Sequence, residues 1–220
     1  MTYFLGVDLG QSNDFTALAV LDKTVPYVEI SREMEHKGVR YLQPGRQAQP
    51  PVYACPLLER VPRETPYPEI VDRVHAMMHR RPLVGSTRLV VDATGVGRPV
   101  VDMLRRRRLD PIAITITGGD AVSRDGSGFR VPKRDLVGVL QVLLQTQRLK
   151  FASGLPSLSA VVQELLAFRV TLSPGGHDSY AAHRESDHDD LVLALAVAAW
   201  YGERERPAAP PPRSRSYHTL

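Results

Sequence analysis

Residues 88–108 constrain the fold of this chain more than any other segment. Residues 88–92, RLVVD, are mostly apolar and predict a fully buried strand that ends in an acid. Gly95 and Gly97 mark a turn, and residues 99–108 predict a helix that starts with proline. A buried strand followed directly by a helix is a βα unit, so we expect an α/β protein with parallel strands in its sheet.

The flanking segments predict a central mixed sheet flanked by helices. Three apolar strands come first and should pair in antiparallel fashion, at residues 3–8, 15–21 and 25–31. A proline-rich segment at residues 36–66 predicts an irregular excursion with one strand near residues 52–58. The remaining expected elements are a strand at 112–116, helices at 66–80, 133–148, 156–168 and 187–201, and a hairpin or mobile loop at 173–185.

Length and composition favour one domain. A chain of 220 residues supports one sizeable core, which we place at residues 1–202, followed by a disordered basic tail rich in proline and arginine at residues 203–220. Cys55 is the only cysteine, so no intramolecular disulfide is possible and an intracellular setting fits. The longest apolar run, residues 191–201, is too short to span a bilayer, so we expect a soluble protein.

The positive charge indicates a polyanionic partner. The net charge is +4, and basic residues gather in two groups. The candidate DNA-binding residues are Arg105, Arg106, Arg107, Arg108, Lys133 and Arg134. Four arginines at the end of a helix are equally consistent with a solvated face near the negative pole of the helix dipole.

Three acidic motifs carry the candidate chemistry: GVDLG at residues 6–10, VVDATG at 90–95 and DHDD at 187–190. Asp8 and Asp92 each end an apolar strand, so their carboxylates meet at one edge if the strands are neighbours. Several carboxylates in one cleft cannot all stay ionised without cations. Two Mg²⁺ or Mn²⁺ ions, about 3.5–4 Å apart, would neutralise them and support phosphodiester hydrolysis.

Each acid also has a plain structural interpretation. Asp8 could form a turn before Gly10, and Asp92 could cap the following helix. Asp189 and Asp190 are ordinary first-turn acids that complement a helix dipole. The combination of the three motifs, and no single one of them, supports a catalytic interpretation.

The stretches GVDLGQSNDFTALAVLD, VVDATGVGRPVVDML and SDHDDLVLALAVAAW resemble the three acidic motifs of the nuclease domain of tailed-phage terminase large subunits, in the same order and with similar spacing. The resemblance covers roughly residues 3–202 and implies a ribonuclease-H-like fold. It also implies a metal-dependent DNA endonuclease that cuts concatemeric viral DNA during genome packaging, by a mechanism with two metal ions.

The resemblance further implies roles for individual residues. Asp8, Asp92 and one of Asp189 and Asp190 would hold the metals, with Asp14 as an accessory acid. We prefer Asp189 to Asp190, because at about 100° per residue it lies nearer the apolar stripe of the last helix. Asp187 and His188 are candidate outer ligands and Lys133 is a candidate for contact with the scissile phosphate, but a solvated surface residue is the favoured interpretation of each.

The expected partners are double-stranded DNA, an ATPase motor domain or subunit, the portal and the small terminase subunit, in the cytoplasm of an infected host cell. No G-x-x-x-x-G-K-[ST] motif occurs in the chain, so we expect motor activity to reside elsewhere. Three other interpretations are weighed: a junction-resolvase type of nuclease, an actin-like or sugar-kinase-like ATP-binding domain suggested by Asp8 to Gly10 with Thr16, and a non-catalytic DNA-binding module.

Overall fold

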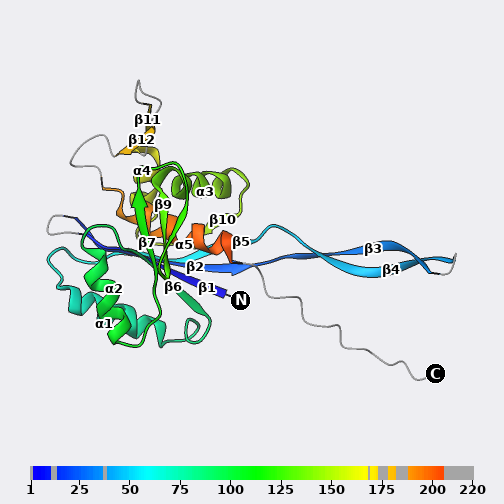
Figure 1. Cartoon of the computed structure of the whole chain (residues 1–220), viewed down its shortest axis with the longest axis horizontal. Coiled ribbons are helices and arrows are strands. Elements are labelled where there is room, and N and C mark those ends of the chain that lie inside the picture. The colour runs from blue at the N-terminus through cyan, green and yellow to red at the C-terminus, as the bar shows by residue number, and fades with distance from the viewer. Residues whose placement is uncertain are drawn as a thin grey trace.

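A mixed sheet runs through the part of the chain that the computed structural model describes, which is residues 2–10, 14–36, 39–167, 169–172, 178–181 and 188–205 (Figure 1). In sheet order its eight strands are β10 (Leu149–Phe151), β5 (Val52–Arg60), β2 (Ala17–Thr24), β1 (Thr2–Asp8), β6 (Thr87–Asp92), β7 (Ile112–Thr117), β9 (Gly128–Pro132) and β8 (Ser123–Asp125). Strands β5, β2 and β1 are antiparallel, whereas β1, β6, β7 and β9 run parallel. The expected mixed sheet is confirmed.

The third strand of the antiparallel start differs from the sequence prediction. Residues 25–31 do not join the main sheet; the strand that pairs with β2 is β5, from the segment expected to be mostly irregular. Burial accounts for this pairing, because Tyr53, Cys55 and Leu58 of β5 are buried in the core. Prolines lowered the apparent strand character of this segment, although Pro56 is tolerated in β5.

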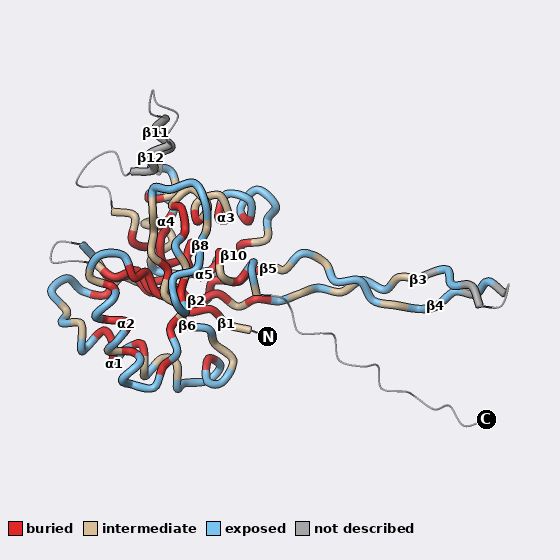
Figure 2. The backbone as a smooth tube through the Cα atoms, viewed as in Figure 1, coloured by how far each residue is buried: buried red, intermediate tan, exposed pale blue. Residues whose placement is uncertain are grey.

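Strands β3 (Tyr27–His36) and β4 (Val39–Ala48) form a separate antiparallel ribbon that projects from the body (Figure 1). The ribbon is largely exposed or partly exposed along its length (Figure 2). Val28, Met34 and Leu42 are exposed apolar residues on it. The segment at residues 39–48 was expected to be irregular, and that expectation is wrong.

Helices cover both faces of the sheet and enclose two apolar cores (Figure 2). One face carries α3 (Lys133–Gln145), α4 (Leu158–Ala167) and α5 (Asp190–Arg204). The other face carries α1 (Tyr67–Met78) and α2 (Gly97–Arg106). The central helix α5 is buried almost all round because it lies between the sheet and α3 and α4. All five helices were expected from the sequence, with ends that differ by a few residues.

The remaining differences concern short elements. The sequence prediction missed β8, β9 and β10, which have three to five residues each and carry too little periodicity to be recognised. Strands β11 (Arg169–Leu172) and β12 (Asp178–Ala181) pair as an antiparallel ribbon. Of the segment expected to form a hairpin or mobile loop, residues 173–177 and 182–185 lie outside the described residues. Helix α5 continues to Arg204, past the expected domain end at residue 202, and residues 206–220 of the expected tail lie outside the described residues.

No helix among the described residues is long and apolar enough to cross a membrane.

Candidate metal centre

Two of the acidic motifs meet at the carboxyl ends of neighbouring parallel strands. β1 and β6 pair in register, with Val7 opposite Val91, so Asp8 and Asp92 end their strands side by side. Both residues are buried, with exposed fractions of 7% and 8%. The expectation that these two carboxylates share one edge of the sheet agrees with this arrangement.

The third motif reaches the same edge because α5 packs very closely on β1. A Cβ atom on Gly6 would lie 2.0 Å from the carbonyl oxygen of Ala194, so only glycine permits this approach. Ala198 of α5 lies against the same position. This contact sets the first turn of α5, which begins at Asp190, over the end of β1.

Crowding and burial change the acidity of the strand-end acids. Burial first, and then the charges of Asp92, Asp190 and Asp189, raise the pKa of Asp8 well above its ordinary value. The pKa of Asp92 is also raised by burial, although Thr94 opposes the shift. The Thr94 backbone N–H and hydroxyl both donate to Asp92 Oδ1, at 2.8 and 2.5 Å. Asp92 is therefore the more firmly held carboxylate of the pair.

Asp190, and not Asp189, is the buried acid of the third motif. Asp190 is only 4% exposed, and its pKa is raised to about 7, mainly by burial. Asp189 is partly exposed, and its Oδ2 accepts a 2.7 Å hydrogen bond from Lys133 Nζ. The sequence prediction preferred Asp189 because of its expected place on the helix. In the structure the helix begins at Asp190 and Asp189 precedes it as the N-cap, so which of the two acids binds a metal stays a prediction.

Two further residues of this region were missed by sequence reasoning. Arg60 Nη2 donates a 2.5 Å hydrogen bond to Glu164 Oε1, and Glu164 Oε2 accepts one of 3.0 Å from the backbone N–H of Val192. Glu164 is buried, and this burial raises its pKa. The pair fixes the first turn of α5, which carries Asp190. Glu164 sits in an apolar helix without a motif, so only its burial reveals it.

The two candidate DNA-binding groups lie in different places. Lys133 begins α3 directly after β9 and contacts Asp189, so it lies at the carboxylate edge. Arg134 is paired with Asp120 and Asp135 instead.

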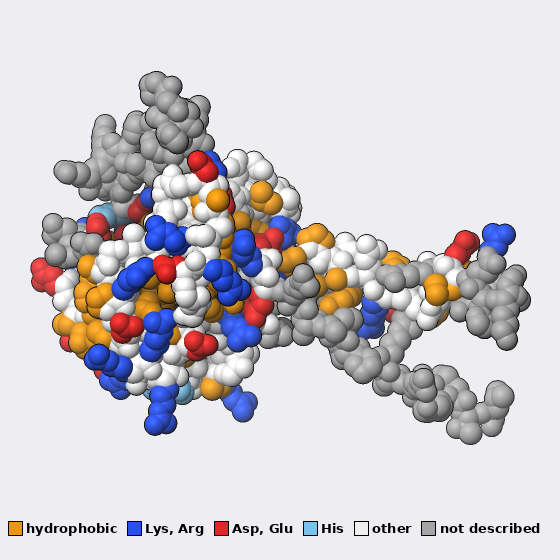
Figure 3. All heavy atoms as spheres, in the orientation of Figure 1, with side chains coloured by type: hydrophobic (Ala, Val, Ile, Leu, Met, Phe, Trp, Pro, Cys, Tyr) orange, Lys and Arg blue, Asp and Glu red, His pale blue; other side chains and the backbone are white. Residues whose placement is uncertain are grey.

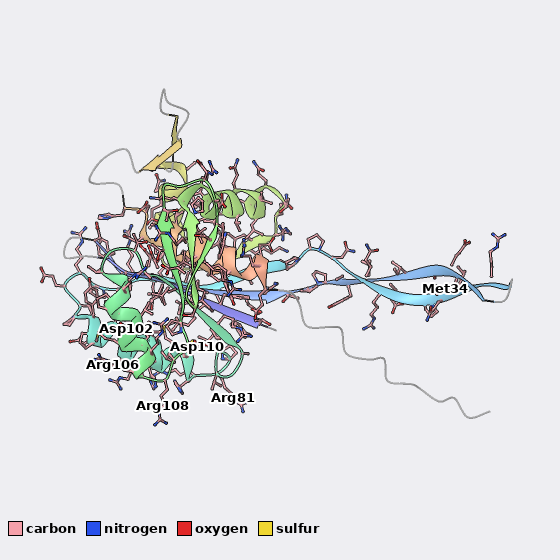
Figure 4. The ribbon with its side chains drawn as sticks, in the orientation of Figure 1. Met34, Arg81, Asp102, Arg106, Arg108 and Asp110 are labelled. Atoms are coloured by element: carbon pink, nitrogen blue, oxygen red, sulfur yellow. The ribbon has the colours of Figure 1, made fainter. Side chains whose placement is uncertain are left out.

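The arginines at residues 105–108 do not reach the carboxylates. They lie at the C-terminal end of α2, whereas Asp92 precedes its N-terminal end. Figure 4 shows Arg106 and Arg108 at that far end of the helix. Arg105 and Arg107 are engaged with Asp102 and Asp72, and Figure 3 shows acidic side chains between the basic ones on this part of the body. Their sequence clustering therefore reflects the end of a helix, and the structure does not bring them to the acidic edge.

Of the three accessory residues expected from the sequence, the structure describes Asp14 and His188. Asp14 is exposed, and its charge contributes to the raised pKa of Asp190, so it lies near the centre. His188 Nδ1 is 3.8 Å from Asp190 Oδ2. Asp187 lies outside the described residues.

The side-chain oxygens of Asp8, Asp92 and Asp190 are suitable ligands for a hard divalent cation. All three are carboxylates, which Mg²⁺ and Mn²⁺ prefer, and Asp190 Oδ2 is buried without a hydrogen-bond partner. The nearest cation atom to it, Arg60 Nε, is 3.6 Å away, too far for a hydrogen bond. As they stand, no three acidic, histidine or cysteine side chains among the described residues converge closely enough to enclose an ion.

Comparison with solved structures shows that this architecture is similar to that of phage large terminase nucleases. The nuclease of the large terminase from thermophilic phage G20c superposes with a TM-score of 0.58 at 19% identity, over 90% of this chain and 80% of that one. The same nuclease has been solved with bound magnesium. The large terminase nuclease domain of Thermus phage P74-26 gives a TM-score of 0.54 at 18% identity, over 90% and 77%.

No protein-family profile matches the chain, and no curated protein matches it in sequence. The structural likeness establishes the fold: the chain has the ribonuclease-H-like fold of large terminase nuclease domains. The expected fold class is confirmed. The resemblance to large terminase nuclease domains that the sequence motifs indicated is also found in the structure.

Proposed function

We propose that this chain is a metal-dependent DNA endonuclease that cuts concatemeric viral DNA during genome packaging. The observation that carries the proposal is the meeting of Asp8, Asp92 and Asp190, three buried acids from three separate elements, at one edge of the sheet. Burying like charges together is costly to the folded protein. A fold that keeps such a cluster has a use for it, and binding of divalent cations is the use that fits carboxylates.

In the proposed centre, Asp8, Asp92 and Asp190 hold Mg²⁺ or Mn²⁺, with Asp14 and Asp189 as further acids nearby. When bound, two such ions activate a water molecule and stabilise the leaving oxygen of a phosphodiester. Thr94 holds the Asp92 carboxylate in place, and the Arg60–Glu164 pair holds the helix turn that carries Asp190. Lys133, held by Asp189, places a cation where the phosphate approaches.

The test is the metal dependence of plasmid cleavage by the whole chain. We expect cleavage of supercoiled DNA with Mg²⁺ or Mn²⁺, none in excess chelator, and none with Ca²⁺, whose looser coordination positions the attacking water poorly. Undiminished cleavage in chelator would contradict a metal mechanism. Preference for four-way junctions over linear duplex would instead favour a junction-resolvase type of nuclease.

The packaging role rests on the likeness to large terminase nucleases. It implies double-stranded DNA as substrate, and as partners a motor ATPase, the portal and the small terminase subunit, within an infected host cell. Pull-down of these components from infected cells with the inactive Asp92→Asn variant tests the assignment. A nuclease that cuts DNA but recovers none of them has the proposed chemistry and a different biological role.

A further inference from the structure

Three side chains at the rim of the metal centre stand outside the carboxylate cluster. Arg63 lies on the loop between β5 and α1, and its Nη2 is 3.0 Å from His188 Nε2. Its guanidinium carbon is 4.3 Å from the centre of the Phe15 ring. The rings of Phe15 and His188 meet edge to face, with centres 5.2 Å apart. Arg63 is thus oriented by side chains from two other segments of the chain.

The other cations beside the acids are already paired with carboxylates. Arg60 is bonded to Glu164, and Lys133 is bonded to Asp189. Within the described ranges, by contrast, Arg63 is exposed and has no carboxylate partner. A guanidinium has five N–H donors, and His188 accepts from only one nitrogen of Arg63. Arg63 therefore retains donors for an acceptor that comes from outside the protein.

His188 connects this arginine to the metal centre. Its Nδ1 lies 3.8 Å from Asp190 Oδ2, on the ring that contacts Arg63 through Nε2. Arg63 is therefore one side chain away from Asp190. A DNA strand that reaches the acids brings phosphates past this position, and a planar guanidinium binds phosphate oxygens in pairs.

We propose that Arg63, oriented by Phe15 and His188, is a phosphate-binding subsite that holds the DNA backbone beside the bond to be cut. This inference rests on the proposed nuclease function. The competing explanation is structural: Arg63 only ties the loop before α1 to the start of α5. The two explanations differ in what they expect of DNA affinity, metal affinity and thermal stability.

The experiment uses the whole chain with Arg63→Ala, Arg63→Lys and a matched control, Arg124→Ala. Arg124 is also an exposed arginine over a phenylalanine, with its guanidinium carbon 4.9 Å from the Phe129 ring centre, but Phe129 packs on Trp200 near the other end of α5. Steady-state cleavage of a labelled duplex with Mn²⁺ gives kcat and KM. Calorimetric titration of DNA-free protein with Mn²⁺ gives metal affinity, and thermal unfolding gives stability.

The phosphate subsite predicts that Arg63→Ala raises KM about tenfold, with kcat, Mn²⁺ affinity and the thermal midpoint nearly unchanged. Arg63→Lys should recover part of the loss, because lysine keeps the charge without the planar fork. When duplex DNA binding is measured in Ca²⁺, the logarithm of the binding constant falls as the logarithm of the salt concentration rises. The magnitude of this slope should be smaller by about one in Arg63→Ala than in the wild type. Arg124→Ala should leave all these quantities within about twofold of the wild type, as is usual for surface substitutions.

Two results would overturn the proposal, and they differ. If wild type cuts DNA and Arg63→Ala keeps its KM, or loses Mn²⁺ affinity and thermal stability together, the subsite is wrong while the nuclease function stands. If wild type neither cuts nor binds DNA with Mn²⁺, both the proposed function and the subsite fail.

Discussion

The two ends of helix α5 differ in whether their buried charged groups have partners. At the C-terminal end, the buried amine of Lys23 donates to the carbonyl oxygens of Gly202 and Glu205, both at 2.6 Å. Arg148 pairs with Glu203 close by. At the N-terminal end, Asp190 is buried among other acids, and its Oδ2 has no hydrogen-bond partner.

We infer from this difference that the charged groups at the C-terminal end stabilise the fold, whereas the acids at the N-terminal end serve another purpose. A cation on the last carbonyls of a helix complements the dipole and satisfies groups that would otherwise lack partners. Carboxylates that crowd one another at the other end raise each other's pKa and reduce stability. The N-terminal end is therefore the end where we expect a ligand to supply the missing positive charge.

The largest expected effect comes from neutralising the strand-end acids. Asp8→Asn or Asp92→Asn should reduce plasmid cleavage on the order of a thousandfold, because metal activation contributes several kcal/mol to the rate. The thermal midpoint should stay or rise, since a repelling charge is lost. Asp22→Asn, on β2 opposite Tyr3 at the other end of the sheet, is the matched control. Retained cleavage in both Asp8→Asn and Asp92→Asn would exclude the proposed function.

A smaller and more selective effect should distinguish the paired acids of the third motif. Asp190→Asn should reduce cleavage more than Asp189→Asn, by about tenfold or more, because Asp190 is the buried acid with an unsatisfied oxygen and Asp189 is held by Lys133. Cleavage rates with saturating Mn²⁺ measure this directly. The reverse order would assign the metal to Asp189.

The pH dependence of stability should differ between the metal-free and the metal-bound protein. The pKa of Asp190 rises from 3.8 to about 7 in the folded state, so the folded protein holds this proton more tightly than the unfolded chain does. Stability without metal should therefore fall as the pH rises from about 4 to about 7. Mn²⁺ should raise the thermal midpoint more at pH 8 than at pH 6, because the ion competes with protons. A midpoint in chelator that increases between pH 6 and pH 8 would contradict this account.

The smallest effect on cleavage is expected at the opposite end of α5. Lys23→Met keeps the length of the side chain but removes both hydrogen bonds, so the free energy of unfolding should fall by about 1–3 kcal/mol. Cleavage should stay within about twofold of wild type at a temperature where the variant is folded. Chemical denaturation and plasmid cleavage measure the two quantities. Loss of cleavage in the folded variant would show that the two ends of the helix are coupled.

Local sequence patterns predicted the elements that carry the acids. The run before Asp92 and the strand before Asp8 are apolar enough to be recognised alone, and both end where the prediction placed them. The apolar stretch after Asp190 predicted a buried helix, which α5 is. These features depend on neighbouring residues, so a single chain segment contains the information.

Only the tertiary structure decided which residues meet. Three features depend on residues far apart in the chain: the pairing of β5 in place of β3 with β2, the buried Arg60–Glu164 contact, and the burial of Asp190 with Asp189 left partly exposed. The sequence likewise left open which basic cluster lies near the acids, since the charge of the arginines at residues 105–108 is visible in the sequence but the direction of α2 relative to the acids is not. Sequence determines hydrophobic period and charge locally, whereas burial and pairing arise from packing between distant segments.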